Sequence, residues 1–251
     1  MSQDIILEAR GLTKEFGGFI AVNDVSLKIK RGSIHALIGP NGAGKTTLFN
    51  LLTIFLTASR GKILFNSEDI TKKHPAEVAT MGLVRSFQIS STYPNLTVLE
   101  NVKLGLQQKY ISSYNFWSSS KCLNALNERA KELIESVGLS NYLQHKAGDL
   151  PYGRKRALEI AATLALDPEM MLLDEPTAGM GHEDVEKIAN LIKEAAVNRT
   201  VLVVEHNLNV VANLSDSITV LQRGKILSEG TYAEISKNLE VQEAYMGTSH
   251  A

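Results

Sequence analysis

Residues 39–47 are the part of the chain whose types and spacing most clearly suggest chemistry. They read Gly-Pro-Asn-Gly-Ala-Gly-Lys-Thr-Thr and fit the pattern G-x-x-x-x-G-K-[ST], the loop that cradles nucleotide phosphates. The glycines let the backbone turn several N–H groups toward one anion, while Lys45 brings a positive charge and Thr46 a hydroxyl for Mg²⁺. We therefore predict a nucleoside triphosphate site made by Gly39, Pro40, Asn41, Gly42, Ala43, Gly44, Lys45, Thr46 and Thr47.

Two carboxylates stand at the end of a strongly apolar run. Asp174 and Glu175 directly follow Met-Met-Leu-Leu at 170–173. A buried parallel strand delivers its last residues to the carboxyl edge of the sheet, where a phosphate loop also lies. Asp174 is predicted to hold Mg²⁺, directly or through water, and Glu175 to polarise the attacking water. The alternative is that Asp174 and Glu175 are simply surface acids at the end of a strand. The presence of a phosphate loop favours the catalytic interpretation over this alternative.

Three further residues are candidates for the same site. Gln88 ends the short segment 84–88, where its amide can reach the metal or the attacking water. His206 follows the apolar run 201–204 and Glu205, a position from which its imidazole can bond the γ-phosphate. Phe16 precedes two glycines and can stack on adenine. Taken singly, Gln88 also fits a solvated loop, and the other two fit ordinary packed side chains.

The elements that must position these residues follow from the hydrophobic pattern. Strand-like alternation at 5–9 and 25–30 predicts an antiparallel β layer ahead of the loop. The run 33–38 is the strand that enters the phosphate loop, and 47–52 is the helix that leaves it. Further on, strands and helices alternate as in parallel βαβ units, at 170–173, 183–196, 200–204 and 208–214.

The middle of the chain has a different pattern. Apolar residues recur at helical spacing in 99–106, 123–137 and 154–166, which predicts a helical subdomain inserted into an α/β core. We expect one domain over 1–251, with the core and β layer at about 1–88 and 168–251 and the helical subdomain at about 89–167. A strand at 61–65, a hairpin of 218–221 with 225–228, and helices at 233–237 and 241–246 complete the expected elements.

Composition narrows the classes of protein. The 251 residues include 26 basic and 27 acidic side chains, a net charge of −1, which argues against nucleic acid as a partner held by bulk charge. Cys122 is the only cysteine, so no internal disulfide can form and a reducing compartment is expected. No signal peptide and no apolar run of spanning length is evident, which predicts a chain that is soluble by itself.

The segment Leu-Pro-Tyr-Gly-Arg at 150–154 connects all these motifs. It opens the helix 154–166, and its Gly153 stands 21 residues before Asp174. Here the sequence resembles the ATPase subunits of ABC transporters over essentially its whole length. The resemblance implies an α/β P-loop NTPase core, with the phosphate loop at 39–46 and the metal and base pair at Asp174 and Glu175. It also implies adenine stacking for Phe16, the lid glutamine at Gln88 and the switch histidine at His206.

The resemblance also implies partners. In that family each ATP is held between two chains, so Leu150, Tyr152, Gly153 and Arg154 would cap the nucleotide bound by a second ATPase subunit, either a copy or a sibling. Transmembrane permease subunits would dock near residues 89–97, where Tyr93, Pro94 and Leu96 are the candidates. The expected location is the cytoplasmic face of the plasma (inner) membrane, as a peripheral subunit, with a periplasmic or extracellular substrate-binding protein as an indirect partner.

Within the family, the sequence is similar to the importers of branched-chain amino acids. The segments that carry this similarity are 13–26, 85–88, 96–102, 150–153 and 243–247. Two departures stand out: Pro151 replaces the family serine, and residues 178–181 lack the family aspartate. An exporter ATPase and a non-transport ABC ATPase remain alternatives, as does a small-molecule kinase, although a kinase has no use for residues 150–154.

Overall fold

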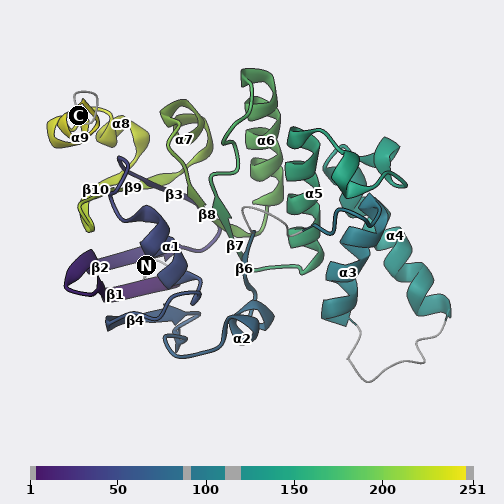
Figure 1. Cartoon of the computed structure of the whole chain (residues 1–251), viewed down its shortest axis with the longest axis horizontal. Helices are drawn as coiled ribbons and strands as arrows, with labels where there is room; N and C mark the ends of the chain where they lie inside the picture. Colours follow the sequence, from purple (N-terminus) through teal and green to yellow (C-terminus); the bar gives the residue numbers. More distant parts are fainter. Residues whose placement is uncertain (1–3, 87–91, 111–119, 247–251) are drawn as a thin grey trace.

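The structure is a computed structural model that describes residues 4–86, 92–110 and 120–246. A four-stranded antiparallel sheet forms one of its layers. Its strands are β1 (Ile5–Phe16), β2 (Phe19–Lys30), β4 (Arg60–Phe65) and β5 (Glu68–Asp69), in the order β2-β1-β4-β5. Gly17 and Gly18, both at positive φ, turn β1 into β2. This sheet is the antiparallel layer that the alternating pattern predicts (Figure 1).

The second sheet is mostly parallel and has the order β10-β9-β3-β8-β7-β6. Among its described strands only β10 pairs antiparallel, as the second arm of a hairpin with β9. The strands are β3 (Ile34–Ile38), β6 (Leu83–Arg85), β7 (Met170–Asp174), β8 (Thr200–Val204), β9 (Ser217–Gln222) and β10 (Lys225–Gly230).

Both faces of this sheet are covered, which explains why its central strands are apolar throughout. Every residue of β3, β7 and β8 is buried. Successive side chains alternate between two cores: Leu172 and Leu202 face the β layer and α1, whereas Leu173 and Val203 face the helices on the other side. Because β3, β8 and β7 pair in parallel, their carboxyl ends lie along one edge of the sheet.

Three helices form a lobe at one end of the molecule (Figure 1). They are α3 (Val98–Tyr110), α4 (Ser120–Ser136) and α5 (Tyr152–Ala165), and each packs against the other two. Two 3₁₀ turns, η1 (Ser140–Tyr142) and η2 (Ala147–Asp149), connect α4 to α5. This lobe corresponds to the helical insertion expected from the sequence.

The remaining helices lie around the parallel sheet. They are α1 (Lys45–Leu52), α2 (Pro75–Thr80), α6 (His182–Ala195), α7 (Leu208–Leu214), α8 (Tyr232–Ile235) and α9 (Leu239–Met246). Helices α8 and α9 lie at the end opposite the α3–α5 lobe (Figure 1). Among the described helices, none combines the length and apolarity that crossing a bilayer requires.

Candidate functional site

The phosphate loop, residues 39–44, joins the buried strand β3 to helix α1. Gly39, Gly42 and Gly44 have φ values of 150°, 75° and 99°, which place all three in backbone conformations that side chains rarely adopt. Residues 41–47 line a pocket of about 700 Å³ that also includes Glu175 and Arg223. The structure thus brings residues 41–47 of the predicted phosphate site and Glu175, a predicted catalytic carboxylate, to the same cavity.

Close backbone packing fixes the shape of this loop. A Cβ at Gly39 would lie 2.2 Å from the Leu221 carbonyl oxygen, and one at Gly44 would lie 2.5 Å from that of Ala21. The β9–β10 turn also bonds the loop, because the Gly224 amide donates to the Ala43 carbonyl at 2.8 Å. Strand β2 and the C-terminal hairpin therefore support the loop from outside, a role that its sequence pattern does not reveal.

Lys45 is folded into its own loop. Its Nζ donates to the carbonyl oxygens of Gly39 at 2.7 Å and Pro40 at 3.1 Å. Burial lowers the pKa of the Lys45 ammonium, and the nearby carboxylates of Glu175 and Asp174 oppose that shift. Lys45 thus places a positive charge at the loop, and the N-terminal amides of α1 add partial positive charge there that favours an anion.

The two predicted carboxylates have different environments. Asp174 is the last residue of β7 and is buried, with its Oδ2 3.3 Å from Nη2 of Arg85. Burial raises the pKa of the Asp174 carboxyl, and the charge of Arg85 counteracts this. Glu175, one residue later, is partly exposed and has a left-handed φ of 45°. Such a backbone conformation is costly for a residue with a Cβ and is common at functional sites.

His206 lies beside Glu175, since each follows the end of one of the neighbouring parallel strands β8 and β7. Its Nδ1 is 3.9 Å from Oε1 of Glu175. Sequence reasoning missed the residue that orders this pair, the fully buried Glu205. Glu205 Oε1 accepts bonds from the amide and hydroxyl of Thr177, and Oε2 accepts one from the His206 amide. The sequence feature that could have indicated Glu205 is its position, a charged residue directly after the apolar strand β8.

Among the described residues that were predicted for the phosphate and catalytic site, Phe16, Gly39, Pro40, Asp174 and His206 do not line this pocket. Gln88 lies outside the described residues. Phe16 stands at the exposed end of β1, where the Lys14 ammonium is 5.0 Å from the centre of its ring. The aromatic and aliphatic side chains in the pocket wall are instead Phe19 and Ile20. The adenine-stacking role of Phe16 stays a prediction, with Phe19 as a second exposed ring close to the loop.

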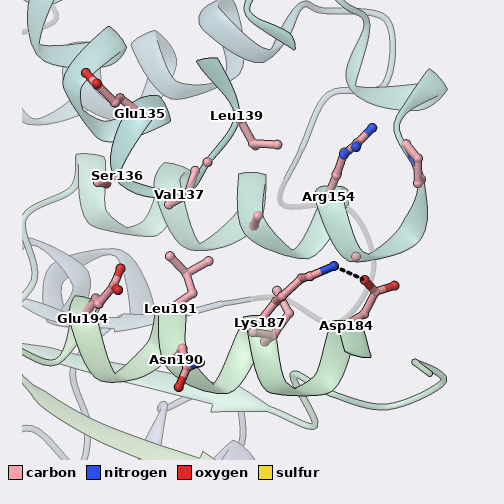
Figure 2. Close-up of a pocket in the computed structure, with 15 residues that line it drawn as sticks. Glu135, Ser136, Val137, Leu139, Arg154, Asp184, Lys187, Asn190, Leu191 and Glu194 are labelled. Carbon is pink, nitrogen blue, oxygen red and sulfur yellow. Dashed lines mark ion pairs between the residues drawn. The ribbon is translucent and has the colours of Figure 1, made fainter. Parts of the chain in front are cut away.

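The segment 150–154 lies in a different place, at the start of α5. Strands β7 and β8 and helix α6 stand between α5 and α1 (Figure 1). Gly153 and Arg154 line a separate groove of about 720 Å³ between α5, the end of α4 and α6. Figure 2 shows Arg154 on one side of this groove and the ion pair of Lys187 with Asp184 on the other. The two predicted halves of the nucleotide site therefore do not meet within one chain.

The side chains of this segment have distinct surroundings. Leu150 is buried in the core of the helical lobe, which leaves only its backbone for the predicted nucleotide contact. Tyr152 is exposed and its hydroxyl accepts a bond from Arg156. Arg154 has its guanidinium 4.1 Å from the centre of the Tyr142 ring. Pro151 is the N-cap of α5, and among the described residues no side chain caps that helix end.

The donor groups near the phosphate loop suit Mg²⁺. Thr46 presents a hydroxyl at the exposed start of α1, and Asp174 presents a carboxylate at the end of β7. Both are hard oxygen ligands, and Mg²⁺ commonly takes one or two protein ligands together with substrate phosphates. In the part of the chain that the structure describes, no group of three or more His, Cys, Asp or Glu side chains forms a dedicated metal cage.

Comparison with known proteins decides the family. The family model described as ABC transporter matches residues 22–178, which include the phosphate loop, the α5 segment and both carboxylates. The chain belongs to the ABC transporter ATP-binding family. A second model, described as branched-chain amino acid ATP-binding cassette transporter, matches the C-terminal residues 225–251.

Individual members of the ABC family resemble the chain along nearly its whole length. It is 37% identical to the high-affinity branched-chain amino acid transport ATP-binding protein LivG of Salmonella typhimurium, over 98% of this chain and 99% of LivG. The ADP conformation of an ATP-binding cassette of an ABC transporter superposes with a TM-score of 0.85 at 34% identity, covering 97% and 99% of the two chains.

A further ABC cassette has been solved as a dimer. That structure is a post-hydrolysis state bound to ADP and Pi, and it superposes with a TM-score of 0.77 at 27% identity, covering 90% and 99% of the two chains. These likenesses confirm the fold class predicted from the sequence, a P-loop ABC ATPase core with an antiparallel layer and inserted helices.

Proposed function

We propose that this chain is the ATP-binding and ATP-hydrolysing subunit that powers an ABC transporter importing branched-chain or related amino acids. The observation that carries the proposal is the shared pocket of the phosphate loop and Glu175, with His206 3.9 Å from that carboxylate. The amino acid cargo is supported by the 37% identity to LivG and by the family match at residues 225–251.

Lys45 and the loop amides bind the β- and γ-phosphates of ATP in this proposal. When the loop binds an anion, the Lys45 ammonium exchanges its contacts with the Gly39 and Pro40 carbonyl oxygens for contacts with the anion. Thr46 and Asp174 would hold Mg²⁺, which neutralises charge on the phosphates when bound. Stacking of the adenine is assigned to Phe16, which extends from the exposed end of β1.

Glu175 acts on the water that attacks the γ-phosphorus. Its carboxylate accepts a proton as the water oxygen bonds to phosphorus and the bond to the bridging oxygen of ADP breaks. His206 donates a hydrogen bond to the γ-phosphate from beside Glu175, and its backbone is fixed by Glu205. Gln88 is assigned to sense the same phosphate from the segment after β6.

A second ATPase subunit completes the site. Because the groove at α5 lies apart from the phosphate loop, Tyr152, Gly153, Arg154 and the backbone of Leu150 would contact ATP held by the partner. The uncapped start of α5 offers amide groups and a favourable dipole to the γ-phosphate. ATP thus links two chains, either two copies or a copy and a sibling.

The membrane side of the assembly is assigned to the loop before α3. Tyr93 is exposed there, and the buried Asn101 fixes the loop by bonding the amide and carbonyl of Tyr93. We place the subunit on the cytoplasmic face of the plasma (inner) membrane, where ATP is available. Transmembrane permease subunits dock at this loop, and an external substrate-binding protein acts through them.

The decisive experiment uses Glu175→Gln, which keeps the shape of the side chain and removes the base. Purified variant is measured by light scattering with and without Mg-ATP. We expect no hydrolysis and an ATP-dependent shift from monomer to dimer. Glu128→Gln is the matched control, since it removes a carboxylate from an exposed ion pair on α4 and leaves hydrolysis unchanged.

Hydrolysis at the wild-type rate by Glu175→Gln would refute the role of this carboxylate. A persistent monomer that still binds ATP would instead identify a sibling subunit or the membrane subunits as the required partner. The cargo is tested separately by ATP-dependent uptake of labelled leucine into vesicles that contain the chain and its membrane partners. Leucine uptake that does not depend on ATP would refute the transport assignment.

A further inference from the structure

Arg85 makes a buried ion pair with the carboxylate of Asp174, the last residue of β7. Arg85 is the last residue of β6, and its Nη2 lies 3.3 Å from Oδ2 of Asp174. The exposed fractions of the two side chains are 13% and 2%. This contact joins neighbouring parallel strands at the edge of the sheet where the site lies.

The same guanidinium is held by the helix that carries Lys45 and Thr46. Its Nη1 donates to Oδ1 of Asn50 on α1. Its central carbon lies 4.7 Å from the centre of the Phe49 ring and 5.4 Å from that of Phe55. Arg85 therefore connects Asp174 to α1 while two aromatic rings hold its plane in place.

A carboxylate as buried as Asp174 is costly to keep charged without a cation beside it. Burial lowers the pKa of the Arg85 guanidinium and raises that of the Asp174 carboxyl, so each group has a desolvation cost that the other reduces. A divalent cation near Asp174 would provide a much larger local charge than Arg85 does. The need for Arg85 is therefore greatest when no metal is bound.

We propose that Arg85 is a positioning residue that serves as the counter-ion of Asp174 in the nucleotide-free protein and keeps this carboxylate aligned with α1. When Mg²⁺ and nucleotide arrive, their charge takes over this role, so the stability that Arg85 provides is specific to the empty state. The part of this inference that concerns Mg²⁺ rests on the proposed function, whereas the ion pair itself does not.

The ion pair is tested in the empty protein by a double-mutant cycle. Arg85→Met keeps much of the length and the contact with both rings, and Asp174→Asn removes the buried charge. Urea unfolding in EDTA is measured for the wild type, both single variants and the double variant. We expect Arg85→Met to lower the unfolding midpoint clearly in the wild-type background and far less in the Asp174→Asn background.

Asn50→Ala is the matched control for this cycle. It removes a second polar contact of the guanidinium, and its effect is expected to be nearly the same in the wild-type and Asp174→Asn backgrounds, because the α1 contact does not depend on that charge. Equal losses of unfolding midpoint from Arg85→Met in both backgrounds would overturn the proposal and leave Arg85 as a packing residue.

The cycle also gives an answer if Arg85→Met does not fold. If the double variant with Asp174→Asn then folds, the proposal holds. If neither folds, Arg85→Lys is compared in the same two backgrounds.

The Mg²⁺ part has its own readout, the midpoint shift produced by Mg-ADP. We expect a larger shift for Arg85→Met than for the wild type, with half-saturation at a several-fold lower Mg²⁺ concentration. A wild type that Mg-ADP does not stabilise would refute the proposed nucleotide function. A wild type that is stabilised, with an equal or smaller shift and no lower Mg²⁺ requirement in Arg85→Met, would refute the counter-ion inference alone.

Discussion

Glu205 and Thr177 are joined by two hydrogen bonds although 28 residues separate them in the chain. The Thr177 amide and hydroxyl donate to the same carboxylate oxygen at 3.0 and 2.7 Å. The other oxygen accepts from the His206 amide at 3.3 Å. Because Glu175 stands two residues before Thr177 in a left-handed conformation, one buried carboxylate fixes the backbone on both sides of the proposed reaction centre.

Glu205→Gln is expected to disturb this arrangement without touching the phosphate loop. A glutamine side chain offers one acceptor oxygen, so its amide nitrogen would face either the Thr177 donors or the His206 amide. Losing hydrogen bonds to a buried charged group costs about 1.5–3 kcal/mol of unfolding free energy. We expect kcat for ATP hydrolysis to fall strongly while KM changes little, as measured by phosphate release.

Thr177→Val is the graded control for Glu205→Gln. It removes the hydroxyl bond and keeps the amide bond, so its losses in stability and kcat should be smaller. If Glu205→Gln retains the wild-type kcat and unfolding free energy, Glu205 does not order the Glu175 turn.

Local sequence was sufficient for the phosphate loop and its strand. A glycine-rich turn, a lysine and an apolar strand are all encoded within residues 34–46, and the structure joins β3 to α1 there. Contacts between residues far apart in the chain could not be predicted from the local sequence. The need for glycine at Gly39 comes from Leu221, and the charge of Asp174 is balanced by Arg85, residues far away in the chain. Hydrophobic spacing carries no record of such pairings.

Strand lengths show another limit of pattern reading. The sequence predicts strands at 5–9 and 25–30, whereas β1 and β2 each extend over 12 residues. Register shifts interrupt their pairing between Ala9 and Leu12, and Gly11 and Asp24 both have positive φ values. A bulge moves later side chains to the opposite face, so the alternation that signals a strand is lost while the pairing continues.

The buried His35 should make stability depend on pH. It lies on β3, with Nε2 2.8 Å from the Thr219 hydroxyl and Nδ1 2.8 Å from that of Ser217. Burial lowers the pKa of His35 from 6.5 to about 4. Between those values the unfolded state binds more protons than the folded state, so stability falls as pH decreases. From pH 7 to pH 5 the loss from this group is about 2 kcal/mol.

His35→Gln keeps hydrogen-bonding capacity and removes the titrating ring. Urea unfolding at several pH values between 7 and 5 should show a shallower loss of stability in this variant than in the wild type. The same pH dependence in both proteins would mean that another group causes the loss.

Arg154 is expected to strengthen pairing between two ATPase subunits. Its guanidinium, 4.1 Å from the centre of the Tyr142 ring, supplies charge at the α5 end where Pro151 provides no hydroxyl. Arg154→Gln in the Glu175→Gln background should weaken Mg-ATP-dependent dimerisation roughly tenfold or more, the effect of one bond to a charged group. Sedimentation velocity over a range of protein concentrations measures this change.

Lys155→Gln is the matched control for Arg154→Gln, because it removes one positive charge from the neighbouring position of α5. Its dimerisation should stay close to that of the Glu175→Gln parent. Equal dimer affinity in the Arg154→Gln variant and the parent would remove Arg154 from the inter-subunit site.

Tyr93 should link ATP hydrolysis to the membrane subunits. Its side chain is 61% exposed on a loop that is tied to α3 by Asn101 and to the 3₁₀ turn η2 by the bond from the Gly148 amide to the Pro94 carbonyl. Tyr93→Asp replaces an exposed apolar surface by a charge, so the isolated subunit should keep its stability and basal ATPase rate. Transport by the assembled complex should fall severely.

Val197→Asp is the matched control for Tyr93→Asp. Val197 has the same 61% exposure and lies in the turn before β8, so this variant should transport normally. Full transport by Tyr93→Asp would show that the membrane subunits dock elsewhere.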